Sequence, residues 1–273
     1  MARIGGRPRS PLENNIEKNN DVYVQALARG LSILSLFDIE HSEWSLGDIS
    51  KQTGISKTTA YRMLRTLEWE GYLSFNPDTE LYHIGPATIP IAYLTLSDIG
   101  FSRLVHPVLE KLAEATGETI ELAVEGKGGA VVVDHVATSH PFKPNLPLGR
   151  VLRNLSNSSM KIFVAYRPEE DRIRAIHDKH IALTTNTKTT PKQINEELEQ
   201  VHKSGLAYDI EEQDIGVCAI SAPVFGVDKE VKAVVTIVTP ADRFTQANRK
   251  RYEHEINATA AELSGYIGHS QTS

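Results

Sequence analysis

The chain has 273 residues, 40% of them hydrophobic and 23% charged, and its formal net charge is -6. This composition excludes a fibrous or largely disordered chain, and the length is sufficient for two domains with separate cores. The acidic balance also argues against a histone-like protein that binds DNA without regard to sequence, because such a protein carries an excess of Lys and Arg.

The cysteine count and the apolar runs indicate the compartment. Cys218 is the single cysteine, so no internal disulfide can form, which is usual in a reducing environment. The longest apolar-leaning run covers residues 86–96 and is shorter than the roughly 20 residues that span a bilayer. No charged start is followed by an apolar signal segment. We therefore expect a soluble, cytoplasmic protein without a membrane segment.

Residues 1–21 are polar, are interrupted by Gly and Pro, and show no apolar period. This pattern predicts a flexible arm. Residues 6–9, Gly-Arg-Pro-Arg, could lie extended in a minor groove of DNA, as arginine-bearing arms do. The alternative, which the pattern favours, is an unstructured tail that carries a few charges.

The first helix is predicted over residues 24–37. Val24, Leu27, Leu31 and Leu34 recur at helical spacing, and we expect them to form the buried face of this helix. That face would pack on the two helices that follow it in the chain.

Two short helices with a glycine turn between them come next. Ser45 and Asp48 match a capping pair at the start of the first helix, which should end at Gly54. Ser56 then caps the second helix. Helix, turn and helix in this order are typical of a motif that docks on DNA.

The second of these helices has an apolar and a basic face. Ala60, Leu64 and Leu67 fall on one buried stripe, and the other face has no acidic residue between Ser56 and Leu67. Arg can bridge O6 and N7 of guanine, and Thr offers a hydroxyl and a methyl group to base edges. The predicted DNA contacts are Thr58, Thr59 and Arg62 nearest the bases, Lys57 and Arg65 nearer the phosphates, and Ser45, Ser56 and Tyr61 beside them.

A hairpin is predicted directly after these helices. Residues 72–75 and 81–84 read as two strands around the turn Asn76-Pro77-Asp78-Thr79. This hairpin would be the wing of a winged helix-turn-helix. The alternative is an ordinary helical subdomain with a solvated charged face, but helix, turn, helix and wing occur here in the order that DNA docking requires.

A linker helix is predicted within residues 86–100, and a second helical stretch runs from 101 to 116. Pro107 lies inside that stretch, so the helix is either kinked there or restarts with Pro107 in its first turn. The apolar positions are more numerous than a spacer requires. They belong either to the second core or to a contact with a partner subunit, and they are Phe101, Leu104, Val108 and Leu112.

From residue 118 the apolar period changes to two, which predicts strands. Short turns join them into two hairpins, and helices with clear caps lie between and after the hairpins. The result is an antiparallel sheet flanked by helices, an α+β domain. The predicted strands are 119–125, 130–136, 217–224 and 231–239, and the predicted helices are 158–166, 168–178, 190–204 and 245–268, the last burying Tyr252, Ile256, Ala260, Leu263 and Ile267.

Three residue groups could indicate an enzyme or a metal site, and each has a simpler interpretation. Ser158 and Lys161 match S-x-x-K, in which Lys activates a Ser nucleophile, but the companion motifs are absent. His177 and His180, with Asp178 nearby, could bind a metal, although two surface histidines are commoner. Paired acids can transfer protons, but solvated turns often carry such clusters as Asp209, Glu211 and Glu212. We therefore expect no catalytic residue, metal or cofactor.

Four stretches resemble the IclR-type bacterial transcription regulators. GISKTTAYRMLRTLEWEGYL, residues 54–73, resembles their recognition helix. HPVLEKLAEATGETIELAV (106–124), SGLAYDIEEQDIGVCAISAPVF (204–225) and TIVTPADRF (236–244) resemble their effector domain. The resemblance implies an N-terminal winged helix-turn-helix, a C-terminal GAF-like domain that binds a small effector, and a homodimer or dimer of dimers on double-stranded DNA with a palindromic operator.

The resemblance also implies an effector pocket in the second domain, for a small organic acid or an aromatic catabolite. Family members usually have a Gly-containing turn where this chain has Ser159-Met160-Lys161, so Met160 replaces the expected Gly and could keep backbone amides from a carboxylate. A helix start with two Ser hydroxyls can still hold a small anion. By position, the pocket residues are Leu152, Ser158, Ser159, Asp209, Val217, Ala219, Thr236 and Val238.

Together these features predict four segments: a flexible arm (1–21), a DNA-binding domain (22–85), a linker helix (86–100) and an effector-binding and oligomerisation domain (101–273). Two other classes of protein remain as alternatives. One is an enzyme with a fused DNA-binding head, and the other is a ligand-independent architectural protein.

Overall fold

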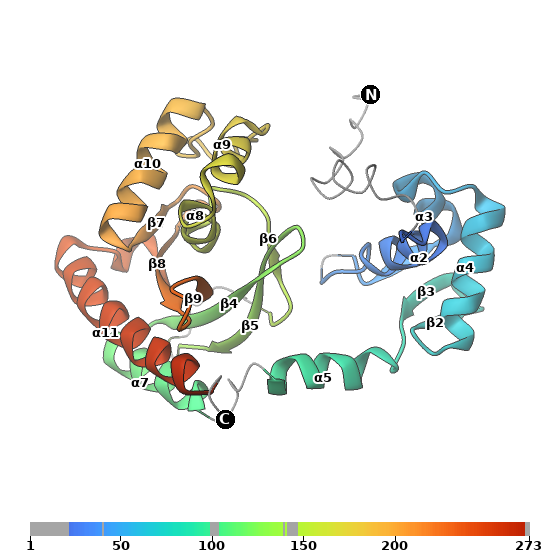
Figure 1. The fold of residues 1–273 in the computed structure, drawn as a ribbon, viewed down its shortest axis with the longest axis horizontal. Coiled ribbons are helices and arrows are strands. Elements are labelled where there is room, and N and C mark those ends of the chain that lie inside the picture. Colours follow the sequence, from blue (N-terminus) through green and yellow to red (C-terminus); the bar gives the residue numbers. More distant parts are fainter. Residues whose placement is uncertain (1–21, 40, 99–103, 139, 141–146, 271–273) are drawn as a thin grey trace. The chain divides into compact units, whose positions relative to one another are not determined.

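The computed structural model describes residues 22–39, 41–98, 104–138, 140 and 147–270. The chain divides between Ile89 and Pro90 into two compact units (Figure 1). Each unit has its own hydrophobic core, as expected for two domains. The predicted arm and its Gly-Arg-Pro-Arg segment lie outside the described residues.

The first unit is a three-helix bundle with a small antiparallel sheet of strand order β1-β3-β2. The predicted hairpin is confirmed as β2 and β3, paired from Leu73↔Ile84 to Asn76↔Leu81. A third strand, β1, was not predicted, because three residues are too few to show an alternating pattern. The elements are α2 (Gln25–Leu34), β1 (Glu43–Ser45), α3 (Leu46–Thr53), α4 (Lys57–Trp69), β2 (Leu73–Asn76) and β3 (Leu81–Ile84).

The turn between α3 and α4 has the geometry that the sequence predicts. The Ser45 hydroxyl accepts a hydrogen bond from the Asp48 amide at 3.1 Å, and Ser56 caps α4 by accepting one from the Thr59 amide at 3.4 Å. Gly54 ends α3 with φ 70°, a left-handed conformation that favours glycine. Ala60 and Leu64 are fully buried, which fixes the back of α4 against the core.

The predicted buried face of the first helix is wrong for three of its four residues. Val24, Leu27 and Leu31 are 61%, 62% and 54% exposed, whereas Ile33 is fully buried. Leu34 packs on the edge of the same core as Ile33. Helix α2 carries two apolar stripes, and helical spacing alone does not tell which of them faces the core.

The boundary between the units falls within α5 (Thr88–Asp98), and α7 (His106–Thr116) follows in the second unit. Pro107 stands in the first turn of α7, so the helix restarts there. Val108 and Leu112 are buried in the core of the second unit, but Leu104 is 55% exposed. Phe101 lies outside the described residues. The structure therefore assigns Val108 and Leu112 to the second core.

The second unit is built on a six-stranded antiparallel sheet of order β6-β5-β4-β9-β8-β7. Both predicted hairpins are confirmed, as β4 with β5 and β8 with β9. The edge strands β6 and β7 were missed because they are short. The strands are β4 (Thr119–Gly126), β5 (Gly129–Val136), β6 (Val151–Leu152), β7 (Ala207–Ile210), β8 (Val217–Phe225) and β9 (Val231–Pro240).

Helices cover both faces of this sheet (Figure 1). One core lies under α7 and α11 and includes the five residues predicted to be buried in the last helix. The other lies under α8, α9 and α10. These helices are α8 (Ser158–Ala165), α9 (Glu169–His177), α10 (Pro191–Ser204) and α11 (Gln246–Ser270), with a short 3-10 turn, η1 (Ala241–Arg243), before the last.

The fold class is confirmed: an N-terminal winged helix-turn-helix is followed by an α+β unit with an antiparallel sheet flanked by helices. No helix within the described residues has both the length and the apolar character needed to cross a membrane.

Candidate functional site

The outer face of α4 is polar and open to solvent. Lys57, Thr58, Tyr61 and Arg62 are exposed, and neither Lys57 nor Arg62 forms an ion pair with a described residue. Thr59 is half-buried, and its hydroxyl lies 2.9 Å from that of Ser56. The structure thus brings most of the predicted DNA contacts to one helix face, held from behind by the buried side of α4.

Arg65 differs from the other basic residues of this face. Its Nη1 donates a hydrogen bond to Glu68 at 2.8 Å, and its guanidinium lies over the Trp69 ring at 5.5 Å from the centroid. Glu68 was overlooked because only the residues between Ser56 and Leu67 were considered for the basic face. Arg65 is therefore oriented along α4 and paired with a carboxylate, whereas Lys57 and Arg62 have no ion-pair partner among the described residues.

Ser45 has a structural role besides any contact with DNA. Its hydroxyl caps α3 and donates a hydrogen bond to the Asp48 carboxylate at 2.7 Å. Nearby, a hollow of about 340 Å³ opens at the start of α4. The hollow contains the exposed cation Arg29 of α2, which sequence reasoning missed because it lies on a different helix. It is lined by Arg29, Ser32, Thr53, Gly54, Ile55, Ser56 and Thr59.

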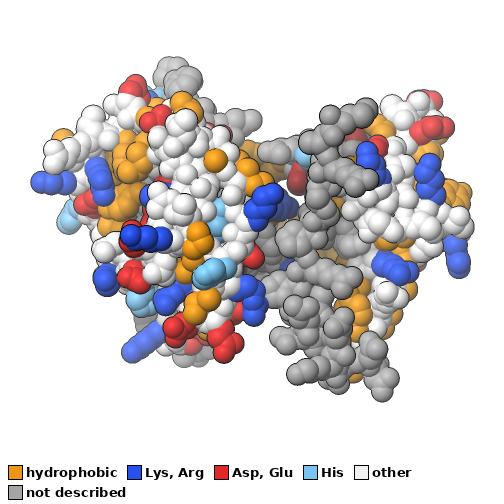
Figure 2. All heavy atoms as spheres, turned by 90° about the horizontal axis from the view of Figure 1, so that it is seen from above, with side chains coloured by type: hydrophobic (Ala, Val, Ile, Leu, Met, Phe, Trp, Pro, Cys, Tyr) orange, Lys and Arg blue, Asp and Glu red, His pale blue; other side chains and the backbone are white. Residues whose placement is uncertain are grey.

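On the face drawn in Figure 2, Lys and Arg side chains stand out singly from the first unit, with exposed hydrophobic side chains between them. No broad basic surface is visible on that face.

In the second unit, the start of α8 lies against the inner face of the sheet. Asn157 caps α8 by accepting a hydrogen bond from the Ser159 amide at 2.9 Å. Ser221 donates to the Ser158 hydroxyl at 2.7 Å. The Thr236 hydroxyl lies 2.7 Å from that of Ser221 and 2.9 Å from that of Ser159. Four buried hydroxyls thus form one chain from α8 across β8 and β9.

Asp209 lies beside this chain on the edge strand β7. Its neighbours in the cross-strand row are Ala219 and Val238. Asp209 Oδ1 accepts hydrogen bonds from the amides of Glu212 at 2.8 Å and Gln213 at 3.3 Å. Burial nevertheless raises the pKa of the Asp209 carboxyl to about 6. The site therefore contains a carboxyl group that titrates just below neutral pH.

The other predicted effector residues, Val217 and Leu152, are not part of the hydroxyl chain at the start of α8. Val217 is half-buried at the start of β8. Leu152 is buried on the opposite edge strand, β6, in the apolar core that also contains Met160. The Met160 thioether accepts a hydrogen bond from the Ala130 amide at 3.2 Å. Met160 therefore points toward β5, and its side chain contributes to the core instead of to the hydroxyl chain.

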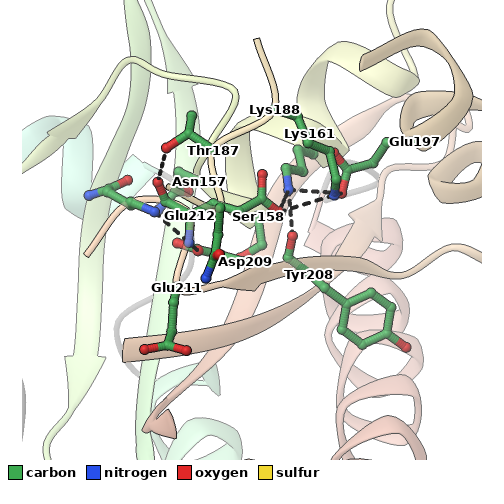
Figure 3. A network of polar contacts seen from close by, with 12 residues as sticks. Asn157, Ser158, Lys161, Thr187, Lys188, Glu197, Tyr208, Asp209, Glu211 and Glu212 are labelled. Carbon is green, nitrogen blue, oxygen red and sulfur yellow. Dashed lines mark hydrogen bonds and ion pairs between the residues drawn. The ribbon is translucent and has the colours of Figure 1, made fainter. Parts of the chain in front are cut away.

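Lys161 is the centre of a buried network of charges (Figure 3). Its ammonium group donates to Glu197 at 2.9 Å, to Glu212 at 2.6 Å and to the Tyr208 carbonyl at 2.6 Å. Lys188 contacts the same two carboxylates. All three N–H donors of Lys161 are occupied, so the S-x-x-K spacing reflects a structural ion pair and not a Ser–Lys pair.

The acidic cluster separates in the structure. The Glu212 carboxylate belongs to the Lys161 network. Asp209 accepts from the backbone amides of Glu212 and Gln213, and Glu211 accepts a hydrogen bond from the Gly216 amide at 2.8 Å. The two histidines contact backbone carbonyls: His177 that of Ile173 and His180 that of Ala175. No group of three or more metal-binding side chains is found in the described part of the chain.

One pair of charges near the hydroxyl chain was not predicted. Glu121 is fully buried on β4 opposite Thr236, and its carboxylate accepts hydrogen bonds from Arg150 Nη2 at 3.1 and 3.2 Å. Burial raises the pKa of Glu121. An acidic residue between the apolar Ile120 and Leu122 was the available signal, but its basic partner lies outside the strand, just before β6.

Comparison with known proteins gives the family. Residues 26–77 match the model of the IclR helix-turn-helix domain, and residues 93–265 match that of the bacterial transcriptional regulator IclR C-terminal domain. The chain belongs to the IclR family. It is a DNA-binding transcription regulator of that family, as the resemblance of its motifs implied.

Relatives of the IclR family match over most of their length. The chain is 28% identical to the transcriptional repressor IclR of Escherichia coli K12 over 244 residues, which are 88% of this chain and 89% of the relative. It is 30% identical over 221 residues to the HTH-type transcriptional regulator Rv1719 of Mycobacterium tuberculosis, covering 81% of this chain and 84% of the relative.

Solved structures share the IclR fold. A regulator from Silicibacter sp. TM1040 superposes with a TM-score of 0.84 at 24% identity, over 89% of this chain and 96% of that one. An IclR homologue from Microbacterium hydrocarbonoxydans, in complex with 4-hydroxybenzoate, superposes with a TM-score of 0.74 at 16% identity, over 91% of this chain and 100% of that one. These structures establish the architecture of both units.

Proposed function

We propose that this IclR-family regulator recognises a palindromic operator through α4. A small effector, bound in the second unit, changes the affinity for that operator. The observation that carries the proposal is the exposed face of α4. Two cations that form no ion pair with a described residue, Lys57 and Arg62, project there with hydroxyl side chains from a helix whose back is buried. A helix of this kind fits a major groove. The chain acts without catalysis of its own.

Each side chain on this face has a distinct proposed role. Thr58, Thr59 and Arg62 lie nearest the bases, and Lys57 contacts phosphate. Arg65 also lies nearer the phosphates, and its ion pair with Glu68 weakens its attraction to them. We add Arg29 to the set, because the hollow that contains it lies at the start of α4, where backbone amides and a cation suit a phosphate.

Two substitutions separate base reading from phosphate attraction. Arg62→Ala should cost about 1–3 kcal/mol of binding free energy and relax the preference at one base position, because a base contact is lost. Lys57→Ala should weaken binding to all sequences alike and reduce the salt slope by about one. The measurement is a salt titration of binding to operator DNA selected from genomic fragments.

Lys127→Ala is the matched control for this experiment, because Lys127 is exposed on a turn of the second unit. If Arg62→Ala lost affinity equally for operator and random DNA, α4 would not read bases through this residue. If the control weakened binding as much as Lys57→Ala, the proposed interface would be wrong.

The proposed effector seat is the start of α8, with its hydroxyls from Ser158 and Ser159, next to Asp209, Ala219, Thr236 and Val238. The donors there suit a small organic acid or an aromatic acid. The homologue that was crystallised with 4-hydroxybenzoate supports a ligand of this size and chemistry. Val217 and Leu152 would form the outer parts of the seat.

The exposed apolar stripe of α2 suggests how the DNA-binding domains of two chains pair. Val24, Leu27 and Leu31 lie on one side of the helix, and each is more than half exposed in the single chain. A palindromic operator requires two heads related by a two-fold axis. We infer that α2 contacts its copy in a homodimer, which could assemble further into a dimer of dimers.

A further inference from the structure

The tip of the hairpin β2–β3, the wing, carries acidic side chains and no Lys or Arg. Residues 72–84 contain Asp78 and Glu80 but neither of the two basic residue types. Both acidic side chains are exposed, and neither forms an ion pair with a described residue. Asn76 fixes the turn by accepting hydrogen bonds from the amides of Asp78 and Thr79 at 2.9 and 3.4 Å. The wing therefore presents two negative charges at a defined place.

The base of the wing is fixed beside α4 (Figure 1). Tyr82 on β3 is buried in the same core as the inner face of α4, and its ring packs on Phe75 with 4.8 Å between the centroids. Burial and the carboxylate of Glu68 on α4 raise the pKa of the Tyr82 hydroxyl, and Tyr61 and Arg65 are also close enough to influence it. The wing thus adjoins the row of α4 that contains Tyr61 and Arg65, two of the predicted DNA contacts.

This placement brings the wing close to DNA phosphates when α4 enters a major groove. The groove is about 12 Å wide, and a helix with its side chains has a diameter of about 10–12 Å. The helix fills the groove, so a hairpin fixed beside it lies over the sugar-phosphate backbone at the edge of the groove. Glu80 and Asp78 precede Tyr82 by two and four residues, which is about 7–13 Å along a strand. This is comparable with the Debye length of about 8 Å at physiological salt.

We propose that the wing of this regulator opposes the general attraction to DNA, because Asp78 and Glu80 repel the phosphates beside α4. The inference rests on the proposed recognition of DNA by α4, and it adds two residues that lower the affinity for DNA of any sequence. Binding by phosphate attraction alone is then weak, and stable binding requires the base contacts of α4.

The composition of the first unit supports this inference. Residues 22–89 contain five Lys and Arg and eight Asp and Glu, so the acidic balance of the whole chain extends to the domain that binds DNA. A domain of this charge gains little from non-specific attraction to phosphates. The acids of the wing are the members of this set that the geometry places over the DNA backbone.

The test is a series of charges at the two wing positions in the full chain. Asp78→Asn/Glu80→Gln removes both charges at nearly unchanged size, and Asp78→Lys/Glu80→Lys reverses them. Fluorescence anisotropy measures the affinity for selected operator DNA and for a random duplex of equal length. The neutral variant should bind about threefold tighter or more and the reversed variant about tenfold tighter or more, by similar factors on both duplexes, because phosphate repulsion does not depend on sequence.

The salt dependence gives a second readout. The slope of log affinity against log salt concentration should become steeper in the reversed variant, by up to about two, because each new cation can release a counterion from the DNA. Glu169→Gln/Glu170→Gln, on exposed positions of α9, is the control. It makes the same change in net charge outside the first unit and should leave the affinity and the slope unchanged. Circular dichroism spectra and unfolding midpoints confirm that each variant is folded.

Three results would overturn the inference. Unchanged affinity in the neutral variant would show that the wing lies away from the DNA. Lower affinity would show that the carboxylates accept hydrogen bonds from amino groups of bases. An equal gain in the α9 control would assign the effect to net charge and not to the wing.

Arg62→Ala separates this inference from the proposed function. If that variant loses affinity for operator DNA while the wing variants bind as the wild type does, recognition through α4 stands and the role of the wing is wrong. If Arg62→Ala has no effect while the wing variants still bind more tightly, the wing faces DNA and the proposed role of α4 is wrong.

Discussion

Asp209 lies on strand β7 inside the candidate effector site, and its carboxylate accepts hydrogen bonds from two backbone amides. Burial raises its pKa from the ordinary value of 3.8 to about 6. Between these values the folded state binds more protons than the unfolded state. The stabilising contribution of Asp209 is therefore complete below pH 3.8 and is lost as the pH rises through 6.

Asp209→Asn should remove this dependence. The variant should be more stable than the wild type at pH 7.5 by roughly 2 kcal/mol, because a pKa difference of one unit corresponds to about 1.4 kcal/mol, while at pH 4.5 the two should differ much less. The amide oxygen of Asn can still accept from the amides of Glu212 and Gln213. Urea unfolding at both pH values measures the difference.

The exposed Asp178 provides the control, since Asp178→Asn should leave the pH dependence of unfolding unchanged. An Asp209→Asn variant that is less stable than the wild type at pH 7.5 would mean that the ionised carboxylate stabilises the fold.

At the residue scale, sequence and structure agree where a residue has a local signature. Ser158 and Ser159 were predicted through the family resemblance, at a position that also reads as a helix start; the structure places them at the start of α8, in contact with Ser221 and Thr236, and their role in effector binding stays a prediction. Arg150 and Glu121 were missed, because their pairing depends on how a turn folds back over the sheet. Local spacing carries no information on such a contact.

At the scale of elements, two glycines that look alike in the sequence have opposite roles. Gly54 ends α3 with φ 70°, and Gly30 lies within α2. A methyl group added at either position would meet no atom within 4 Å. Backbone conformation alone therefore decides the effect of replacing them.

Gly54→Ala should lower the free energy of unfolding by about 1 kcal/mol, because Ala disfavours the left-handed conformation. Gly30→Ala should raise it by about 0.5–1 kcal/mol, because Ala is the better helix former. Chemical denaturation of the two variants beside the wild type measures both. Effects of the same sign would refute the assignment of these conformations.

Helices and hairpins with clear caps or turns were predictable as elements. Helix α10, for example, begins after the Thr190 cap and ends at Gly205 as expected. The strands β1, β6 and β7 were not, because they are short and, unlike β2 and β3, are not joined to a neighbouring strand by a recognisable short turn. The inward face of α2 was also misassigned, since both of its faces are apolar.

At the scale of the whole molecule, the exposed stripe of α2 makes the inferred pairing of two heads testable. Leu27→Glu and Leu31→Glu should each lower the affinity for DNA with two half-sites by about tenfold or more, because the second head is no longer held beside the first. Affinity for a fragment with one half-site should stay unchanged. Ile173→Glu, on an exposed position of α9, is the control.

Equal losses on one and two half-sites would show that the stripe belongs to the head itself and not to a contact between heads. The sequence predicted the two-unit architecture through motifs spread along nearly the whole chain. Which surfaces meet in the assembled regulator depends on partners that a single sequence does not contain.

The hydroxyls of Ser158, Ser221, Thr236 and Ser159 in the second unit donate their hydrogen bonds in one direction along the chain. Ser221 gives its proton to Ser158, so the bond between Ser221 and Thr236 must be donated by Thr236, and the next one by Ser159. The proton of Ser158 is then used by none of the other three. Ser158 is left with a proton to offer and Ser159 with lone pairs, so neighbouring residues of the proposed effector site present opposite polarity, which would orient a molecule bound there.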